Sequence, residues 1–281
     1  MKIAATGGSG FLGAHLIPRL VQDGHTVFAL ARSASSADVV RALGATPVPG
    51  DLDKPDELSL PAVDAVVHAA ALFRFAGPRA PYFSANVTGT EAVLNAARLA
   101  GGAATFVYIS AAAVTMDDRG TPASNIDESA PTYPRSFSGY IASKSQGEAA
   151  VLAANGPGFR TIALRPPALW GPGGPFSKQL PHAIESGQFA FIGSGEYPVS
   201  TIHVDNVVEA VQCALERGTG GRPISSTTAT WSPSANSSLG SPNWKVTRSM
   251  ACAPCLTVSR SPSDDSWKPS RRCAPTRATR R

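Results

Sequence analysis

The sequence predicts a doubly wound α/β fold, in which a parallel sheet carries helices on both faces. Short apolar segments alternate with longer helical patterns over roughly the first 220 residues, which is typical of βαβ units. The first apolar segment also runs directly into a glycine-rich turn and a helix, "KIAATGGSGFLGAHL". Together these features predict a parallel sheet that starts with the first residues of the chain.

Strands and helices are expected in alternation along the chain. The apolar segments that predict strands are residues 2–6, 26–30, 46–50, 65–70, 105–110 and 161–166. The segments with helical periodicity are residues 11–24, 36–44, 86–101 and 140–156. Glycine and proline then become frequent in "PPALWGPGGPFSKQL", where a second lobe is expected to begin.

Composition narrows the class of protein. The chain has 281 residues, 43% of them hydrophobic. No apolar run approaches the ~18 residues of a membrane span and no signal peptide is recognised, so a soluble cytoplasmic protein is expected. Residues 223–281 hold nine Lys or Arg and two Asp, whereas the preceding residues hold 16 basic and 18 acidic side chains. The body is therefore not basic, and a nucleic-acid partner is not expected. Cys252 and Cys255 lack a second pair of ligands, so no metal is expected.

The turn after the first strand has the spacing of a dinucleotide-binding loop. Gly7, Gly10 and Gly13 stand three apart between a strand and a helix. Glycine permits a tight turn and a close approach of the backbone to a pyrophosphate, and the helix N-terminus offers N–H groups and the positive end of the helix dipole. We therefore predict a Rossmann-type NAD(P) site in which Gly7, Gly10, Phe11, Leu12 and Gly13 contact the cofactor.

The end of the second strand indicates which cofactor is bound. NAD sites usually carry an acidic residue there, which holds the ribose 2′-hydroxyl, but this chain has Ala31 and Arg32. A guanidinium suits a 2′-phosphate, so NADP is expected in preference to NAD. Plain NAD, with Arg32 lying over the adenine, is the alternative. Asp51 and Leu52 are expected to flank the adenine.

Tyr140 and Lys144, in "SGYIASKSQGE", stand four apart and therefore on one face of a helix. A phenol with a pKa of about 10 is a poor acid or base at neutral pH. An ammonium one turn away, together with the positive nicotinamide, stabilises the phenolate and lowers that pKa. The pair is predicted to be catalytic, with Tyr140 passing a proton to or from a substrate oxygen while a hydride moves on the adjacent carbon.

These features together resemble the extended short-chain dehydrogenase/reductase family, also called the NAD-dependent epimerase/dehydratase family. The resemblance covers residues 1 to about 222 and rests on "TGGSGFLG", "GDL", "VVHAAA", "NVTGTEAVLNAA", "FVYIS", "YIASK", "LRPPALWGPG" and "IHVDNVVEA". Two longer segments, "NVTGTEAVLNAARLAG" and "HVDNVVEAVQCAL", are most similar to 3β-hydroxysteroid dehydrogenases and their sterol- and flavonol-reducing relatives. The resemblance implies further cofactor contacts from Ala69, Ala70, Asn86, Tyr140, Lys144, Pro166 and Leu169. In many relatives the helix that carries Tyr140 pairs with its counterpart, which implies a possible homodimer.

One position departs from the pattern of the family. The strand before the active site ends there in two hydroxyl residues, the second of which donates a hydrogen bond to the substrate oxygen. Here the segment is "YISAAAV", so Ser110 matches the first hydroxyl and Ala111 occupies the second position. Losing such a donor can cost on the order of 10²–10³ in rate. Ser110 remains a candidate catalytic residue, with water or Thr115 as alternative donors.

The composition changes after residue 222. Four serines have the spacing of apolar residues on an amphipathic helix, yet serine does not drive burial: Ser234, Ser237, Ser238 and Ser241. A one-base shift of the reading frame explains this, because TCN serine codons then place thymine in the middle position, where it encodes apolar residues. We interpret residues 223–281 as a frameshifted, mostly disordered tail, the alternative being a basic solvated or interaction arm. The expected domains are an NAD(P)-binding domain over residues 1–165, the start of an incomplete substrate lobe with returning sheet elements over 166–222, and this tail.

The function that the sequence favours is hydride transfer between NADP(H) and a secondary alcohol or ketone on a hydrophobic small molecule. A nucleotide-sugar epimerase or dehydratase is the alternative among enzymes, although "LFRFAGPRAPYF" and "PPALW" are apolar for a substrate that carries a diphosphate. A protein that binds NADP without turnover is the alternative outside enzymes, suggested by Ala111 and the incomplete lobe.

Overall fold

The centre of the fold is a parallel sheet of seven strands. The computed structural model describes residues 1–74, 77–119, 126–188, 200–226, 244–246 and 258–260. The strand order is β3-β2-β1-β4-β5-β6-β9, and every neighbouring pair is parallel. The strands are β1 Lys2–Thr6, β2 Thr26–Ala31, β3 Thr46–Pro49, β4 Ala65–His68, β5 Thr105–Ile109, β6 Arg160–Arg165 and β9 Arg222–Ser225. The order reverses between β1 and β4, which is where open α/β sheets bind their ligands.

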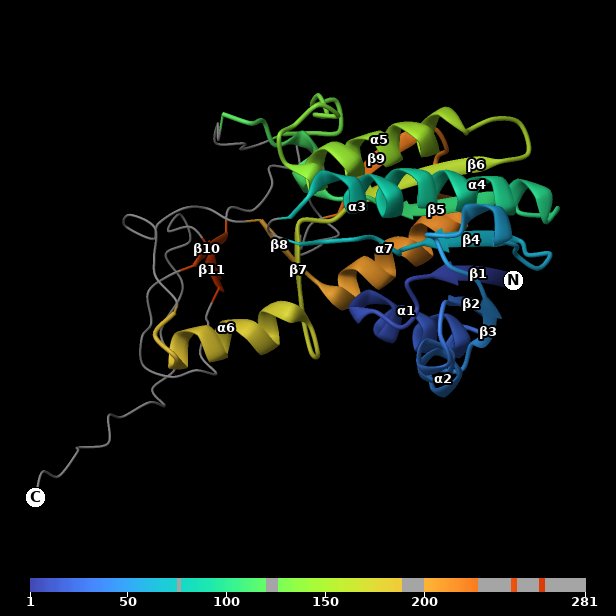
Figure 1. Ribbon diagram of the computed structural model, residues 1–281, viewed down its shortest axis with the longest axis horizontal. Helices are drawn as coiled ribbons and strands as arrows, with labels where there is room; N and C mark the ends of the chain where they lie inside the picture. The colour runs from blue at the N-terminus through green and yellow to red at the C-terminus, as the bar shows by residue number, and fades with distance from the viewer. Residues whose placement is uncertain (75–76, 120–125, 189–199, 227–243, 247–257, 261–281) are drawn as a thin grey trace, which may run out of the picture. The chain divides into compact units, whose positions relative to one another are not determined.

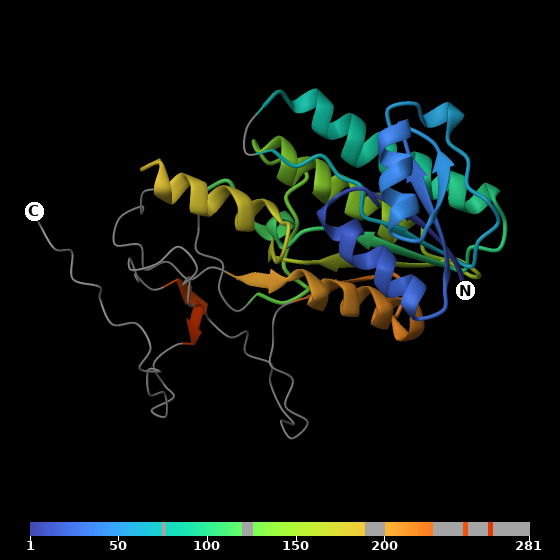
Figure 2. The same ribbon diagram turned by 90° about the horizontal axis from the view of Figure 1, so that it is seen from below.

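Helices cover both faces of this sheet (Figure 1). One face carries α4 (Gly89–Leu99) and α5 (Gly139–Ala153), which contact each other. The other face carries α1 (Phe11–Gln22), α2 (Ala34–Ala42) and α7 (Val204–Arg217), and Figure 2 shows α1 and α7 side by side. The predicted doubly wound class is therefore confirmed.

Alternate strand residues supply a separate core on each face, because successive side chains of a strand point to opposite sides. Ile3, Val67 and Val107 pack with α1 and α7 residues such as Leu16 and Val211. Their neighbours in sequence pack with α4 and α5, and that second core contains Ala4, Val66, Val93, Phe106, Tyr108 and Val151. Burial on both faces explains why the strands read as continuous apolar segments rather than as alternating ones.

Several short elements lie outside the predicted alternation. A 3₁₀ turn, η1, spans Pro55–Glu57, and another, η3, spans Ala112–Thr115. The short helix α3 (Arg79–Phe83) and the π-helical turn η2 (Ser84–Thr88) lead directly into α4. Beyond the sheet, β7 (Ala168–Trp170) pairs in parallel with β8 (Thr201–His203), and α6 spans Pro175–Glu185.

The end of the chain is described only in part. Strand β9 pairs with β6 and so carries the sheet three residues past residue 222. A second unit, which comprises residues 190–199 and 242–281, contains an antiparallel pair formed by β10 (Trp244–Val246) and β11 (Val258–Arg260). The four serines and the Cys252–Cys255 pair discussed above lie outside the described residues. Within the described part of the chain, no helix combines the length and the apolar character that crossing a membrane would require.

Candidate active site

The predicted site residues gather at one edge of the sheet. Gly7 follows β1, Ala69 follows β4, Ser110 follows β5 and Pro166 follows β6, and all four strands are parallel. The carboxyl ends of parallel strands meet at the same edge, so these four residues lie at the reversal point of the strand order or beside it. The fold therefore assembles in space what the sequence spreads over 160 residues.

The glycine-rich loop has no room for side chains at two of its three glycines. Gly7 has a φ of 72°, and a Cβ there would lie 2.8 Å from the backbone nitrogen of Ala70. A Cβ on Gly13 would lie 2.4 Å from the carbonyl oxygen of Gly8. Gly10 caps α1 without any side-chain hydrogen bond, and the first turn of α1 holds no acidic residue. The helix N-terminus is therefore open to an anion, which fits the pyrophosphate of a dinucleotide.

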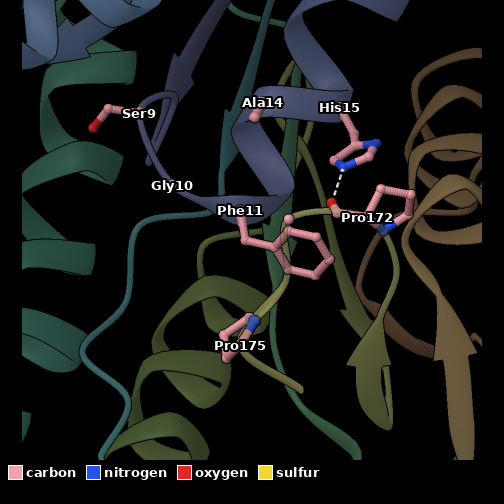
Figure 3. Close-up of a pocket in the computed structure, with 8 residues that line it drawn as sticks. Ser9, Gly10, Phe11, Ala14, His15, Pro172 and Pro175 are labelled. Carbon is pink, nitrogen blue, oxygen red and sulfur yellow. Dashed lines mark hydrogen bonds between the residues drawn. The ribbon is translucent and has the colours of Figure 1, made fainter. Parts of the chain in front are cut away.

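A pocket of about 510 Å³ opens beside this loop (Figure 3). It lies between the first turn of α1 and residues 172–175, and its lining is Ser9, Gly10, Phe11, Ala14, His15, Pro172, Gly173 and Pro175. His15 Nε2 donates to the carbonyl oxygen of Pro172 at 3.0 Å, so the two walls are joined directly. Two of the predicted cofactor residues, Gly10 and Phe11, thus line a real pocket, whereas Leu12 packs against the hydrophobic core.

The adenine end of the predicted site is more exposed. Arg32 follows β2 directly, is exposed, and forms no ion pair within the described residues. Asp51 is half-buried, and its carboxylate accepts from the backbone N–H of Asp53 at 3.1 Å. Leu52 packs beside the start of α4, where a Cβ on Gly89 would lie 3.0 Å from its own Cβ. Arg32 is therefore free to meet an anionic group at the tip of β2.

Tyr140 and Lys144 lie in the first half of α5, which the Ser138 hydroxyl caps by accepting from the Ile141 N–H. Tyr140 is half-buried, and the ring of Phe73 meets its ring edge-on at 4.9 Å between centroids. Burial raises the pKa of Tyr140 to about 12, so the phenol is neutral at pH 7.

Lys144 is only 1% exposed, and its surroundings disfavour a charge. Burial lowers the pKa of Lys144 to about 7, and the negative charge of Glu148 opposes that shift. Its Nζ donates to the carbonyl oxygen of Ile109 at 2.6 Å. It also lies 4.0 Å from the centroid of the Tyr108 ring.

Both candidate hydroxyl donors are engaged elsewhere. Ser110 Oγ donates to a carboxylate oxygen of Glu148 at 2.6 Å, and Thr115 Oγ1 donates to the carbonyl oxygen of Ala112 at 2.9 Å. Ala111, at the position of the family's second hydroxyl, is buried. For Ser110 to donate to a substrate it would have to exchange its bond to Glu148, and its catalytic role stays a prediction.

Asn86 joins α5 to the segment that follows β4. Its amide makes paired hydrogen bonds with Leu72, accepting from the N–H at 2.7 Å and donating to the carbonyl at 3.1 Å. It also donates to Ser143 Oγ at 3.0 Å, which in turn donates to the carbonyl of Tyr140. Asn86 sits in η2, a π-helical turn, and such turns are frequent at functional sites.

His68, for which no role was predicted, is wholly buried at the end of β4. Its Nδ1 lies 2.6 Å from Thr6 Oγ1, and its Nε2 lies 3.0 Å from Thr90 Oγ1. Thr90 uses its own proton on the carbonyl of Asn86, so it accepts from Nε2–H, and Thr6 therefore donates to Nδ1. Burial lowers the pKa of His68 to about 3, so the ring is neutral. The one available signal was a histidine inside the apolar segment "VVHAAA".

A buried ion pair was also missed. Arg165 donates to both carboxylate oxygens of Glu148, the shortest contact being 2.6 Å, and both side chains are at most 5% exposed. The pair joins β6 to α5 one turn beyond Lys144. The available signal was a carboxylate four residues after Lys144, on the helix face that Tyr140 and Lys144 share.

Comparison with known proteins matches residues 3–225 to the model of the NAD dependent epimerase/dehydratase family. The chain belongs to this family. It is 44% identical over 224 residues to a 4-hydroxy-2-methyl-3-oxo-4-farnesyl-3,4-dihydroquinoline-1-oxide ketoreductase of Stigmatella aurantiaca. That alignment covers 79% of this chain and 66% of the relative. The chain is 30% identical over 227 residues to a 3-beta-hydroxysteroid dehydrogenase of Mycolicibacterium neoaurum, in an alignment that covers 76% of this chain and 61% of the relative. The alignments thus span slightly less than two thirds of these relatives.

Among solved structures, the fold is similar to that of DesIV, a dTDP-glucose 4,6-dehydratase of Streptomyces venezuelae solved with NAD and TYD bound. The TM-score is 0.68 at 24% identity, and the match covers 80% of this chain and 75% of the other. At this identity the likeness confirms the Rossmann-type fold alone. The predicted resemblance to the epimerase/dehydratase family and to hydroxysteroid dehydrogenases is confirmed, as is the lineage of NAD(P)-dependent oxidoreductases.

Proposed function

We propose that this protein is an NADP-preferring reductase that interconverts a ketone and a secondary alcohol on a hydrophobic small molecule. The observation that carries the proposal is the placement of Tyr140 and Lys144 on α5 at the sheet edge that also bears the glycine-rich loop. The names of two relatives support the reaction type, because one is a ketoreductase and the other a hydroxysteroid dehydrogenase. NADP(H), when bound, supplies or accepts the hydride.

The proposal gives a defined role to each of the predicted site residues named below. Gly7, Gly10 and Gly13 shape the loop and expose the N-terminus of α1 to the pyrophosphate. Arg32 meets the 2′-phosphate, and this assignment supports NADP over NAD. In the direction of reduction the general acid must start protonated, and Tyr140 is neutral at pH 7 because burial raises the pKa of its phenol.

The substrate class follows from apolar side chains near the candidate site. Phe73 packs on Tyr140 and is 54% exposed, and Phe137, just before α5, is 74% exposed. Exposed apolar surface beside a candidate general acid fits an apolar substrate, and Phe73 supplies such surface against Tyr140. A farnesyl group in the name of one relative and a steroid in the name of the other agree with an apolar substrate. We assign the start of the lobe that completes this surface to residues 166–222, which also contain the returning helix α7, and pairing of α5 in a homodimer belongs to the same proposal.

A second candidate function is binding of NADP without turnover. It is favoured by one observation, namely that Ala111 offers no hydroxyl while Ser110 and Thr115 donate elsewhere. A turnover assay that follows NADPH oxidation with a panel of apolar ketones separates the two functions. Turnover supports the reductase, whereas NADPH binding without turnover across the panel supports the second candidate.

The catalytic assignment is tested by Tyr140→Phe, with Tyr133→Phe in the preceding loop as the matched control. The first substitution should reduce the turnover rate by about 10²–10⁴, because the general acid is lost, and leave NADPH affinity unchanged. The control should retain full turnover. Activity retained in Tyr140→Phe would overturn the assignment.

A further inference from the structure

The ring of Tyr108 lies beside the terminal nitrogen of Lys144 inside the core. It lies on β5 with its ring fully buried, and Lys144 Nζ is 4.0 Å from the ring centroid. An ammonium over an aromatic face is attracted by the ring's quadrupole, most strongly where water is excluded. The only other group bonded to this ammonium among the described residues is the carbonyl oxygen of Ile109, at 2.6 Å. Both contacts favour the charged form.

The ring of Tyr108 is itself held in place by a neutral neighbour. His68 stacks on it with an interplanar angle of 25° and a centroid separation of 5.6 Å. His68 is fixed in turn by the hydroxyls of Thr6 and Thr90, as described above. Because its imidazole carries no charge, it adds no full positive charge next to the ammonium.

The hydroxyl of Tyr108 plays no comparable part. It is buried beside the Thr90 hydroxyl, and within the described residues it makes no hydrogen bond of normal geometry. A phenol buried in this way costs free energy that a phenylalanine would not, so the hydroxyl does not explain the choice of residue. The aromatic face, by contrast, meets the one buried ammonium among the described residues.

We propose that Tyr108 is a positioning residue, whose aromatic face favours the charged form of the buried Lys144 against the effect of burial and directs it toward the end of β5. Its part in turnover rests on the proposed function, because that function gives Lys144 its role beside Tyr140. Its effect on the protonation of Lys144 does not depend on turnover. The charged and titratable groups around Lys144 are Tyr140 and Glu148 on α5, His68 on β4, Tyr108 on β5, and Arg165 on β6 through its pair with Glu148.

The test compares two substitutions of Tyr108. Tyr108→Phe keeps the aromatic face and removes only the hydroxyl, whereas Tyr108→Met removes the face and keeps an apolar side chain. The readout is NMR of the protein with its lysines labelled with ¹³C at Cε, followed from pH 5 to 10. The chain has six lysines, so about six resonances are expected. The resonance of Lys144 is the one that disappears in Lys144→Met.

In Tyr108→Met we expect the titration midpoint of Lys144 to fall by about one pH unit, a tenfold change in protonation. In Tyr108→Phe it should stay where it is. Phe106→Leu is the control for general damage, because Phe106 is also fully buried on β5, faces the same core and contacts His68 and Phe159 instead. It should lower stability and leave the midpoint unchanged. An unchanged midpoint in folded Tyr108→Met, or an equal fall in Phe106→Leu, would overturn the proposal.

The same variants separate this inference from the proposed function. If the reductase function holds, the pH profile of kcat in Tyr108→Met shifts in the direction of the NMR midpoint, while the profile of Tyr108→Phe does not. If no ketone is reduced but the NMR midpoint still shifts in Tyr108→Met, the proposed function fails and the role of Tyr108 stands.

Discussion

The guanidinium of Arg32 stands exposed at the tip of β2, without an ion pair among the described residues. We predict that Arg32→Ala weakens NADPH binding by about 10- to 100-fold, because a charge-assisted hydrogen bond to the 2′-phosphate is lost. NADH binding should change little. Arg41→Ala is the control, since Arg41 is exposed on α2 and pairs with Asp38 instead. Equal losses for the two cofactors, measured by nicotinamide fluorescence, would contradict a role in NADP selection.

Glu148 and Arg165 show how much a buried pair depends on both partners. Glu148→Gln leaves the Arg165 guanidinium buried without a counter-charge, so we expect the free energy of unfolding to fall by about 3–5 kcal/mol. Replacing both residues by apolar ones of similar size, Glu148→Leu with Arg165→Met, should recover much of this loss. Urea unfolding measures both, with Glu91→Gln on the exposed side of α4 as the control. A double variant less stable than Glu148→Gln would show that the attraction between the two charges exceeds the free energy lost in desolvating them.

His68 gives the fold a dependence on acid pH. Burial lowers its pKa from 6.5 to about 3, so below pH 6.5 the unfolded chain binds a proton that the folded chain does not. Its contribution to stability is complete above pH 6.5 and is lost as the pH falls toward 3. We expect a slope of about 1.4 kcal/mol per pH unit between pH 5.5 and 4.5 that is absent in His68→Gln. Parallel pH profiles of the two proteins in urea unfolding would mean that His68 titrates normally in the fold.

At the scale of elements, the close approach of α5 to η2 depends on a glycine. A Cβ on Gly147 would lie 2.4 Å from the carbonyl oxygen of Asn86 and 2.8 Å from the Tyr108 hydroxyl. Gly147→Ala should therefore push α5 outward and cost about 1–3 kcal/mol of stability. It should also lower turnover, because Tyr140 and Lys144 move with the helix. Gly156→Ala, where a Cβ would meet nothing within 4 Å, is the control and should change neither. If Gly147→Ala kept the wild-type free energy of unfolding and turnover rate, α5 and η2 could move apart at little cost.

Most regular elements were predicted, whereas α6, α7 and β9 fell outside the predicted ranges and the irregular elements were not predicted. Six strands and four helices follow from apolar runs and helical periodicity, because burial on two faces leaves a strong pattern. The π-helical turn at Asn86 and the short pair β7–β8 carry no such pattern, since they are set by tertiary packing. Among the site residues, Tyr140 and Lys144 stood out by spacing alone. Tyr108 did not, because a tyrosine in "TFVYIS" reads as an ordinary core residue until the neighbouring ammonium is seen.

At the scale of the whole molecule, the last described strand of the sheet and the match to the family model end at the same residue. Strand β9 closes the sheet at Ser225, and the match to the family model also ends at residue 225. The alignments cover 66% of the ketoreductase and 61% of the hydroxysteroid dehydrogenase, so about a third of each relative has no aligned counterpart here. After residue 225 this chain has a basic, serine-rich composition that does not resemble the body.

We predict that the gene lacks one base relative to its functional ancestor, a G in the run that encodes Gly221 and Arg222. The shifted frame should be open beyond this point and should encode a strand, a turn and an amphipathic helix, because TCN serine codons place thymine in the middle position. Restoring the base should give a more soluble protein with higher reductase activity, since a completed lobe would cover apolar surface and exclude water from the site. The nucleotide sequence is the first measurement. Stop codons within a few codons of Arg222 in the shifted frame would rule out the frameshift, and the basic tail would then need an explanation as encoded.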